Sequence, residues 1–159
     1  MARPIQFVAS SKLNASAERV FAFHEAPGAL ERLTPPWEPV DLVERPKGIR
    51  DGDRGVIRVG PGPFKLRWVI EHRDYIRNRQ FRDVQISGPF RSWNHLHLIT
   101  PDGPNGSILE DRIEFVLPLG ALGNFFGGWF VLRKLRRLFE FRHRVTAEAV
   151  TEKVVADSE

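Results

Sequence analysis

The chain has 159 residues, the usual size of a single domain with its own hydrophobic core. It contains no cysteine, which excludes disulfide frameworks and thiolate metal sites. Lysine and arginine number 24 against 20 acidic residues, so the formal net charge is only +4. Because so small an excess of positive charge is weak support for nucleic-acid binding, we expect no nucleic-acid partner.

Neither a signal peptide nor a membrane span is favoured. Residues 1–18 contain no long apolar stretch, so we expect no signal peptide and a cytoplasmic protein. The uncharged run 116–132 approaches the length of a membrane span. Pro118, Asn124 and several glycines interrupt this run, and its first residues continue a strand-like pattern, so we interpret it as part of a folded domain.

One strand and two short helices are expected at the start of the chain. Residues 5–10 are apolar and strand-like. Ser16 is a typical helix N-cap, and Glu18 lies in the first turn, where the helix dipole favours an acid. Pro27 and Gly28 end this helix, and the prolines within 34–37 end a second, shorter one.

Six strand-like segments follow the helices, separated by turns rich in glycine and proline. Apolar residues alternate with charged ones in several of them, for example at Leu66, Trp68 and Ile70. This alternation indicates an antiparallel sheet with one apolar face and one face in solvent. The segments are 38–46, 54–60, 64–76, 79–86, 90–100 and 107–117.

A long amphipathic helix is predicted from about residue 122, where the apolar spacing changes to three and four residues. Arginines and lysines between 133 and 144 mostly cover its other sides. We expect one domain over 1–150 and a flexible tail over 151–159. The apolar stripe of the helix comprises Leu122, Phe125, Trp129, Leu132, Leu135 and Phe139.

The chain resembles the helix-grip superfamily, which includes START lipid-transfer domains, birch-pollen-allergen-like proteins and polyketide cyclases. It is similar in particular to bacterial members labelled "cell division inhibitor" or "cyclase/dehydrase". Some of these relatives are fused to a nucleotide-sugar-epimerase-like domain, whose GxGxxG motif this sequence lacks. The resembling segments are 14–40, 62–75, 79–98, 109–123 and 139–145.

The resemblance implies an α+β fold with a specific architecture. A seven-stranded curved antiparallel sheet would surround a long C-terminal helix, with two short helices after the first strand. It also implies a small hydrophobic ligand and no cofactor. The superfamily hosts transfer, sensing and catalysis on this scaffold, so the fold alone does not decide the function.

Two histidines, His95 and His97, lie one residue apart on the strand 90–100. On a strand they share a face with Trp93 and Ile99, and we predict that this face points inward. In the alternative register the intervening leucines point inward and both histidines lie in solvent. A buried imidazole needs a partner, so the inward register demands an acidic neighbour.

Asp83 and Asp111, on the flanking strand segments, are the expected partners of these histidines. The group could close a structural network, line a pocket or shuttle protons. An HxH pair could also hold a metal with Asp111 or His72 as a third ligand. The chain lacks the further ligand spacing of a cupin and the superfamily is not generally metal-dependent, so the sequence assigns no metal.

The favoured function is binding of a small hydrophobic or aromatic ligand, lipid- or polyketide-like, in a cavity of several hundred Å³ between the sheet and residues 122–139. One alternative is a cyclase or dehydratase that uses His95, His97 and Asp111 as catalytic groups. Another is a membrane-surface or partner-binding module that uses the basic helix. The oligomeric state stays open. The expected ligand-binding residues are Trp68, His72, Phe81, Asp83, Trp93, His95, His97, Asp111, Phe115, Phe125 and Trp129.

Overall fold

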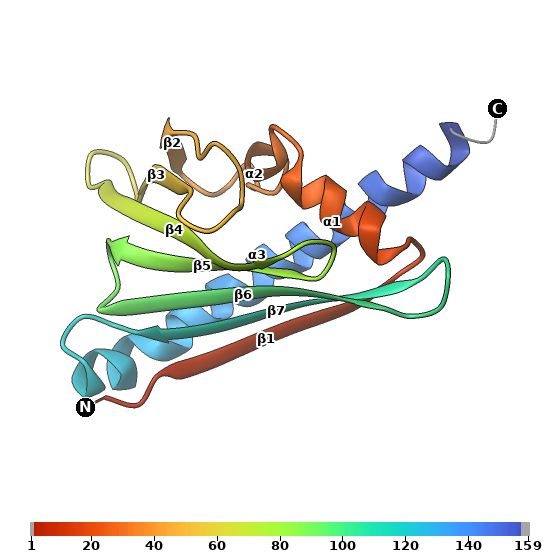
Figure 1. Cartoon of the computed structure of the whole chain (residues 1–159). Coiled ribbons are helices and arrows are strands. Elements are labelled where there is room, and N and C mark those ends of the chain that lie inside the picture. Colours follow the sequence, from red (N-terminus) through yellow and green to blue (C-terminus); the bar gives the residue numbers. More distant parts are fainter. Residues whose placement is uncertain (1, 157–159) are drawn as a thin grey trace.

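In the computed structural model, which describes residues 2–156, one curved antiparallel sheet wraps along a long helix (Figure 1). The seven strands are ordered β1-β7-β6-β5-β4-β3-β2, so β1 closes against β7 and every other neighbour is consecutive in sequence. This architecture confirms the predicted helix-grip fold. The elements are β1 Ile5–Leu13, α1 Ala17–Glu25, α2 Ala29–Arg32, β2 Val40–Glu44, β3 Arg54–Val59, β4 Leu66–Ile76, β5 Gln80–Ser87, β6 Ser92–Pro101, β7 Ser107–Val116 and α3 Ala121–Ala156.

Strand β6 turns the predicted residues inward. Trp93, His95, His97 and Ile99 are all buried, while the residues between them are half-buried on the outer face. Alternation therefore fixes the register as predicted, because a slip of one residue would have exposed the whole set. Both histidines thus belong to the interior of the sheet.

Helix α3 extends beyond residue 150, the expected end of the domain. It continues through Ala156, so residues 151–156 of the expected tail are helical, and residues 157–159 lie outside the described part of the chain. Thr146 and Val150 are only 1% and 2% exposed, and Val150 belongs to the same core cluster as Val20 and Phe21 of α1. No helix within residues 2–156 is both long and apolar enough to cross a membrane.

The first turns of α3 present their aromatic residues to solvent, contrary to the expectation for Phe125 and Trp129. These side chains are 79% and 65% exposed. Gly127 and Gly128 occupy the side of the helix that faces the sheet, and a Cβ at Gly128 would lie 2.6 Å from Cδ1 of Ile5. The helix backbone therefore approaches the sheet too closely for a side chain there, and the aromatic residues are rotated outward.

Aromatic side chains fill the centre of the concave face instead of leaving the predicted cavity there. The rings of Trp68 and Trp93 lie 5.2 Å apart, and Phe90 lies 4.8 Å from Trp93. Phe7 and Phe139 meet at 5.5 Å between β1 and α3. These side chains belong to one packed cluster that joins the sheet to α3.

Candidate functional site

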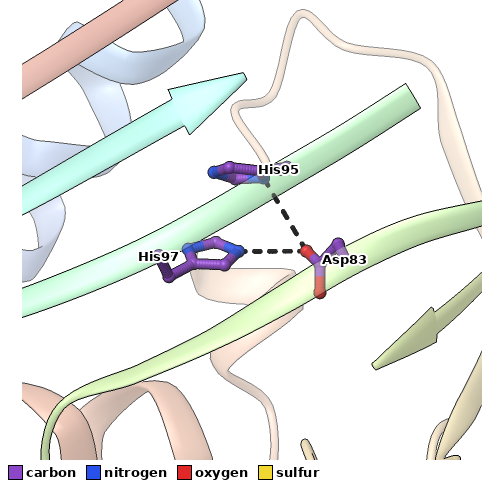
Figure 2. A group of neighbouring side chains, drawn as sticks. All are labelled: Asp83, His95 and His97. Atoms are coloured by element: carbon purple, nitrogen blue, oxygen red, sulfur yellow. Dashed lines mark hydrogen bonds and ion pairs between the residues drawn. The ribbon is translucent and has the colours of Figure 1, made fainter. Parts of the chain in front are cut away.

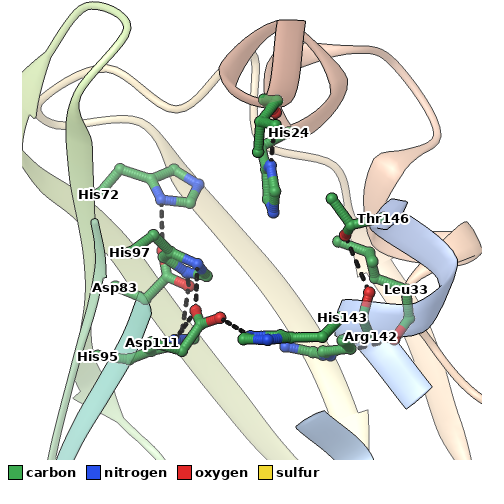
Figure 3. A network of polar contacts seen from close by, with 11 residues as sticks. His24, Leu33, His72, Asp83, His95, His97, Asp111, Arg142, His143 and Thr146 are labelled. Carbon is green, nitrogen blue, oxygen red and sulfur yellow. Dashed lines mark hydrogen bonds and ion pairs between the residues drawn. The ribbon is translucent and has the colours of Figure 1, made fainter. Parts of the chain in front are cut away.

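All five histidines of the chain converge on one buried polar cluster (Figure 3). The two strands that flank β6 contribute one aspartate each, and the histidines come from two helices and two strands. Six elements from along the whole sequence therefore supply one site. Its members are His24 of α1, His72 of β4, Asp83 of β5, His95 and His97 of β6, Asp111 of β7 and His143 of α3.

Asp111 is the centre of the cluster on the side of α3. Its Oδ1 accepts a hydrogen bond from His95 Nε2 at 2.7 Å, and its Oδ2 accepts one from His143 Nε2 at 2.7 Å. His97 Nδ1 lies 2.8 Å from Oδ1 of Asp111 but out of line for a hydrogen bond. On the far side, His143 Nδ1 is hydrogen-bonded to Ser11 Oγ of β1 at 2.7 Å. Asp111 is only 3% exposed, so its charge depends on these imidazoles.

Asp83 holds the other end of the cluster. Its Oδ1 accepts a hydrogen bond from His72 Nδ1 at 2.7 Å, and its Oδ2 accepts one from His97 Nε2 at 3.0 Å. The strand pairing brings the aspartates and the β6 histidines together, because Asp83 lies opposite His95 and His97 lies opposite Asp111. Phe81 covers the group, with its ring stacked 4.1 Å from that of His97.

The two carboxylates polarise the cluster. Burial alone would lower the pKa of His97, but the charges of Asp83 and Asp111 outweigh it and raise that pKa to about 9. Burial would likewise raise the pKa of each aspartate, yet the charge of His97 and the imidazole hydrogen bonds hold both well below the usual value. Burial, together with the charge of His97, lowers the pKa of His95 to about 4. At neutral pH a charged His97 therefore lies between two carboxylates and beside a neutral His95.

His24 closes the cluster from above. Its Nδ1 donates to the carbonyl oxygen of Val20 at 2.8 Å, and its ring lies 6.1 Å from that of His97 (Figure 3). Burial and the nearby charge of His97 lower the pKa of His24 to about 4. His24 is therefore neutral at physiological pH.

Sequence reasoning found the strand members of the cluster and missed the two helical ones. His24 and His143 were not among the expected site residues. The buried face of α3 would have indicated His143, because it follows Phe139 by four residues. His24 follows the buried Val20 by the same interval on α1. On each helix, the sequence signal was a histidine one turn after a buried apolar residue.

An open groove of about 720 Å³ lies between the edge strand β1 and α3, and its wall reaches the cluster through His143. The β1 side comprises residues 6–13, and the α3 side runs from Leu132 to Ala147. Phe7 and Phe139 supply apolar surface, while Arg136 lies at the solvent side. The groove thus lies at the edge of the sheet and along a later part of α3 than the cavity predicted from the sequence.

The other expected ligand-binding residues fall into two groups. Trp68, Trp93 and Phe115 pack in the concave interior, and Phe115 is fully buried. Phe125 and Trp129 lie in solvent, apart from both the interior and the groove.

Solved structures share the architecture. A norcoclaurine synthase mutant from Thalictrum flavum superposes with a TM-score of 0.72 at 13% identity, covering 96% of this chain and 98% of that chain. A START superfamily protein from Mycobacterium smegmatis gives 0.65 at 14% identity, covering 92% and 97%. A nucleoside-diphosphate sugar epimerase from Corynebacterium glutamicum gives 0.67 at 23% identity over 91% of this chain, which spans only 29% of that protein. At these identities the likeness establishes the fold alone.

Sequence comparison identifies the family. No curated protein matches the chain. The family model for polyketide cyclase/dehydrase and lipid transport matches residues 13–139. This range begins at the last residue of β1, contains all of β2 to β7 and ends about halfway along α3. The chain therefore belongs to the polyketide cyclase/dehydrase and lipid transport family, with the START-like helix-grip fold of ligand-binding proteins.

Proposed function

We propose that the chain binds a small, mainly apolar ligand with a polar end in the groove between β1 and α3. The supporting observation is the groove itself, whose volume of about 720 Å³ falls in the usual range of ligand sites. Phe7, Leu132 and Phe139 would contact the apolar body, and His143 and Ser11 would meet the polar end. A lipid- or polyketide-like molecule has this chemistry, in keeping with the family.

The geometry supports binding better than turnover. The three candidate catalytic groups, His95, His97 and Asp111, are at most 7% exposed and lie behind His143 and Phe139. A ligand in the groove would touch only His143 of the cluster. A cyclase or dehydratase needs its acid and base within hydrogen-bond reach of the reacting atoms. We therefore assign the groove to binding.

Filling the groove should weaken binding. Ala147 lines the groove on α3, so Ala147→Trp should reduce the affinity for the apolar dye N-phenyl-1-naphthylamine by more than about tenfold, because the indole takes the place of buried ligand. Dye fluorescence measures the binding, and the melting temperature verifies the fold of the variant.

Ala22→Trp is the matched control, because Ala22 is an exposed helical alanine away from the groove. It should bind the dye like the wild type. A folded Ala147→Trp variant that binds the dye with wild-type affinity would place the ligand elsewhere.

A second candidate function is contact with an anionic membrane surface, and a different observation favours it. The outer side of the first turns of α3 carries large apolar residues that are all more than half exposed, whereas soluble proteins rarely expose such a patch without a partner. We call this patch the aromatic face of α3, and it consists of Leu122, Phe125, Phe126, Trp129 and Phe130.

Positive charge adjoins the aromatic face. Arg133, Lys134, Arg136 and Arg137 follow on the next turns and are exposed. Aromatic residues beside lysine and arginine suit the headgroup region of an anionic bilayer, where each cation contributes about 1 kcal/mol. A family that includes lipid carriers would use such a face to meet the membrane.

Removing two rings from this face should weaken membrane binding. The double variant Phe126→Ser, Phe130→Ser should bind vesicles of phosphatidylcholine and phosphatidylglycerol at least about tenfold more weakly than the wild type, since two large apolar groups no longer insert. Cosedimentation measures the binding, and high salt should weaken it for both proteins.

Val43→Ser is the control, since Val43 is an exposed apolar residue of β2, and it should leave binding unchanged. The wild type could instead fail to bind the vesicles and form dimers in light scattering. If the double variant does not form these dimers, the aromatic face of α3 binds a second copy of the chain.

A further inference from the structure

Three atoms that could bind a metal ion lie close together in the cluster. Asp83 Oδ2 lies 3.0 Å from His97 Nε2 and 3.7 Å from His95 Nδ1 (Figure 2). The ligand atoms of these three residues all lie within 4.8 Å of one another. Neighbouring strands β5 and β6 carry the three side chains, so the sheet holds the arrangement in place.

Their separations suit a small metal ion. Bonds of 2.0–2.1 Å to nitrogen and oxygen in a tetrahedral zinc site place adjacent ligand atoms about 3.3 Å apart. The two separations given above, 3.0 Å and 3.7 Å, lie on either side of that value. Two imidazoles and one carboxylate are also a donor set that zinc and related divalent ions favour.

One contact in the metal-free arrangement is unfavourable. His95 donates its Nε2 proton to Asp111, so in the neutral ring the Nδ1 atom carries a lone pair. This lone pair lies 3.7 Å from the carboxylate oxygen Oδ2 of Asp83, so two acceptors face each other between a buried imidazole and a half-buried carboxylate. A cation between them would convert this repulsion into two bonds.

The outer partners match those of metal ligands. In metal sites the second nitrogen of a ligating histidine usually donates to a carboxylate, which orients the ring. His95 makes this contact with Asp111 at 2.7 Å, and His97 Nδ1 lies 2.8 Å from the same aspartate. The remaining oxygen of Asp83 accepts from His72. His95 and Asp83 thus each have a hydrogen-bonded outer partner, and a carboxylate lies beside the outer nitrogen of His97.

Charge balance points the same way. Asp83 and Asp111 bring two negative charges into the cluster, and every ion pair recorded for them within residues 2–156 involves a histidine. Arg142 lies nearby, but its Nε donates to the carbonyl oxygen of Leu33. A divalent cation would neutralise the charge of both carboxylates.

We propose that Asp83, His95 and His97 form a binding site for a divalent transition-metal ion of the zinc class. Binding displaces a proton from His97 and leaves Asp111 and His72 as outer partners. Three protein ligands leave at least one coordination position for water or a further ligand, as in catalytic zinc sites. The site is separate from the groove and does not depend on the proposed ligand.

The test uses untagged, chelator-treated protein titrated with Zn²⁺ against a chromophoric competitor, and with Co²⁺ followed by visible absorption. We expect about one ion per chain, a cobalt absorption band and a higher melting temperature with metal. His95→Gln and His97→Gln should each weaken binding at least about 100-fold, and Asp111→Asn, an outer-partner change, by about 10- to 100-fold.

Glu148→Gln, an exposed acid on α3, is the control and should bind metal like the wild type. The wild-type titration decides the proposal even if the cluster variants fail to fold. A wild type with no cobalt band and no metal-dependent shift in melting temperature overturns it, as does full retention of Zn²⁺ by a folded His95→Gln variant.

Discussion

Replacing Asp111 with alanine should destabilise the metal-free protein by about 3–5 kcal/mol, the usual effect of removing one partner from a buried ion pair. Asp111 is 3% exposed and accepts hydrogen bonds from His95 and His143, with His97 in contact. Its loss leaves the Nε2 atoms of His95 and His143 without their acceptor and a charged His97 with one carboxylate fewer. Urea denaturation with a chelator present measures the change in unfolding free energy.

Glu114→Ala is the matched control on the same strand. Glu114 is exposed on the outer face of β7 and makes one solvent-exposed hydrogen bond, from Gln6. This change should alter the free energy of unfolding by less than about 0.5 kcal/mol. Equal effects of the two substitutions would mean that the cluster contributes nothing specific to stability.

The strand part of the cluster was predictable from the sequence because strands have a strict period of two. Once Trp93 and Ile99 required the interior, His95 and His97 had to follow, and the antiparallel order brought Asp83 and Asp111 beside them. No comparable rule fixes how a helix is rotated about its axis.

The glycines of α3 illustrate why the orientation of the first turns of this helix was not predictable. Apolar spacing favours Phe125 and Trp129 as inward residues, yet the close contact between Gly128 and Ile5 turns the opposite side of the helix to the sheet. Only the packed structure reveals which side has too little space for a side chain. The groove beside β1 was not predictable for a similar reason, because its size depends on the distance between α3 and the edge strand.

The stability of the metal-free protein should pass through a maximum near pH 6.5, the ordinary histidine pKa. His97 has a folded-state pKa raised to about 9, so its contribution is complete below pH 6.5 and is lost as the pH rises from 6.5 through 9. His95 and His24 have pKa values lowered to about 4, so their contributions are complete above pH 6.5 and are lost as the pH falls toward 4. Below that, protonation of Asp83 and Asp111, whose pKa values are depressed, removes further stability.

The alkaline side of this profile is the more diagnostic, because few types of side chain change their contribution to the free energy of unfolding between pH 6.5 and 9. Each pH unit there should lower the free energy of unfolding by about 1.4 kcal/mol at most, measured by urea denaturation with chelator present. His97→Gln should flatten this side and leave part of the acid side, because burial still lowers the pKa of His95 and His24. His24→Gln should reduce the acid side and keep the alkaline one. A wild-type profile that is level from pH 7 to 9 would mean that His97 carries no extra proton between the two carboxylates.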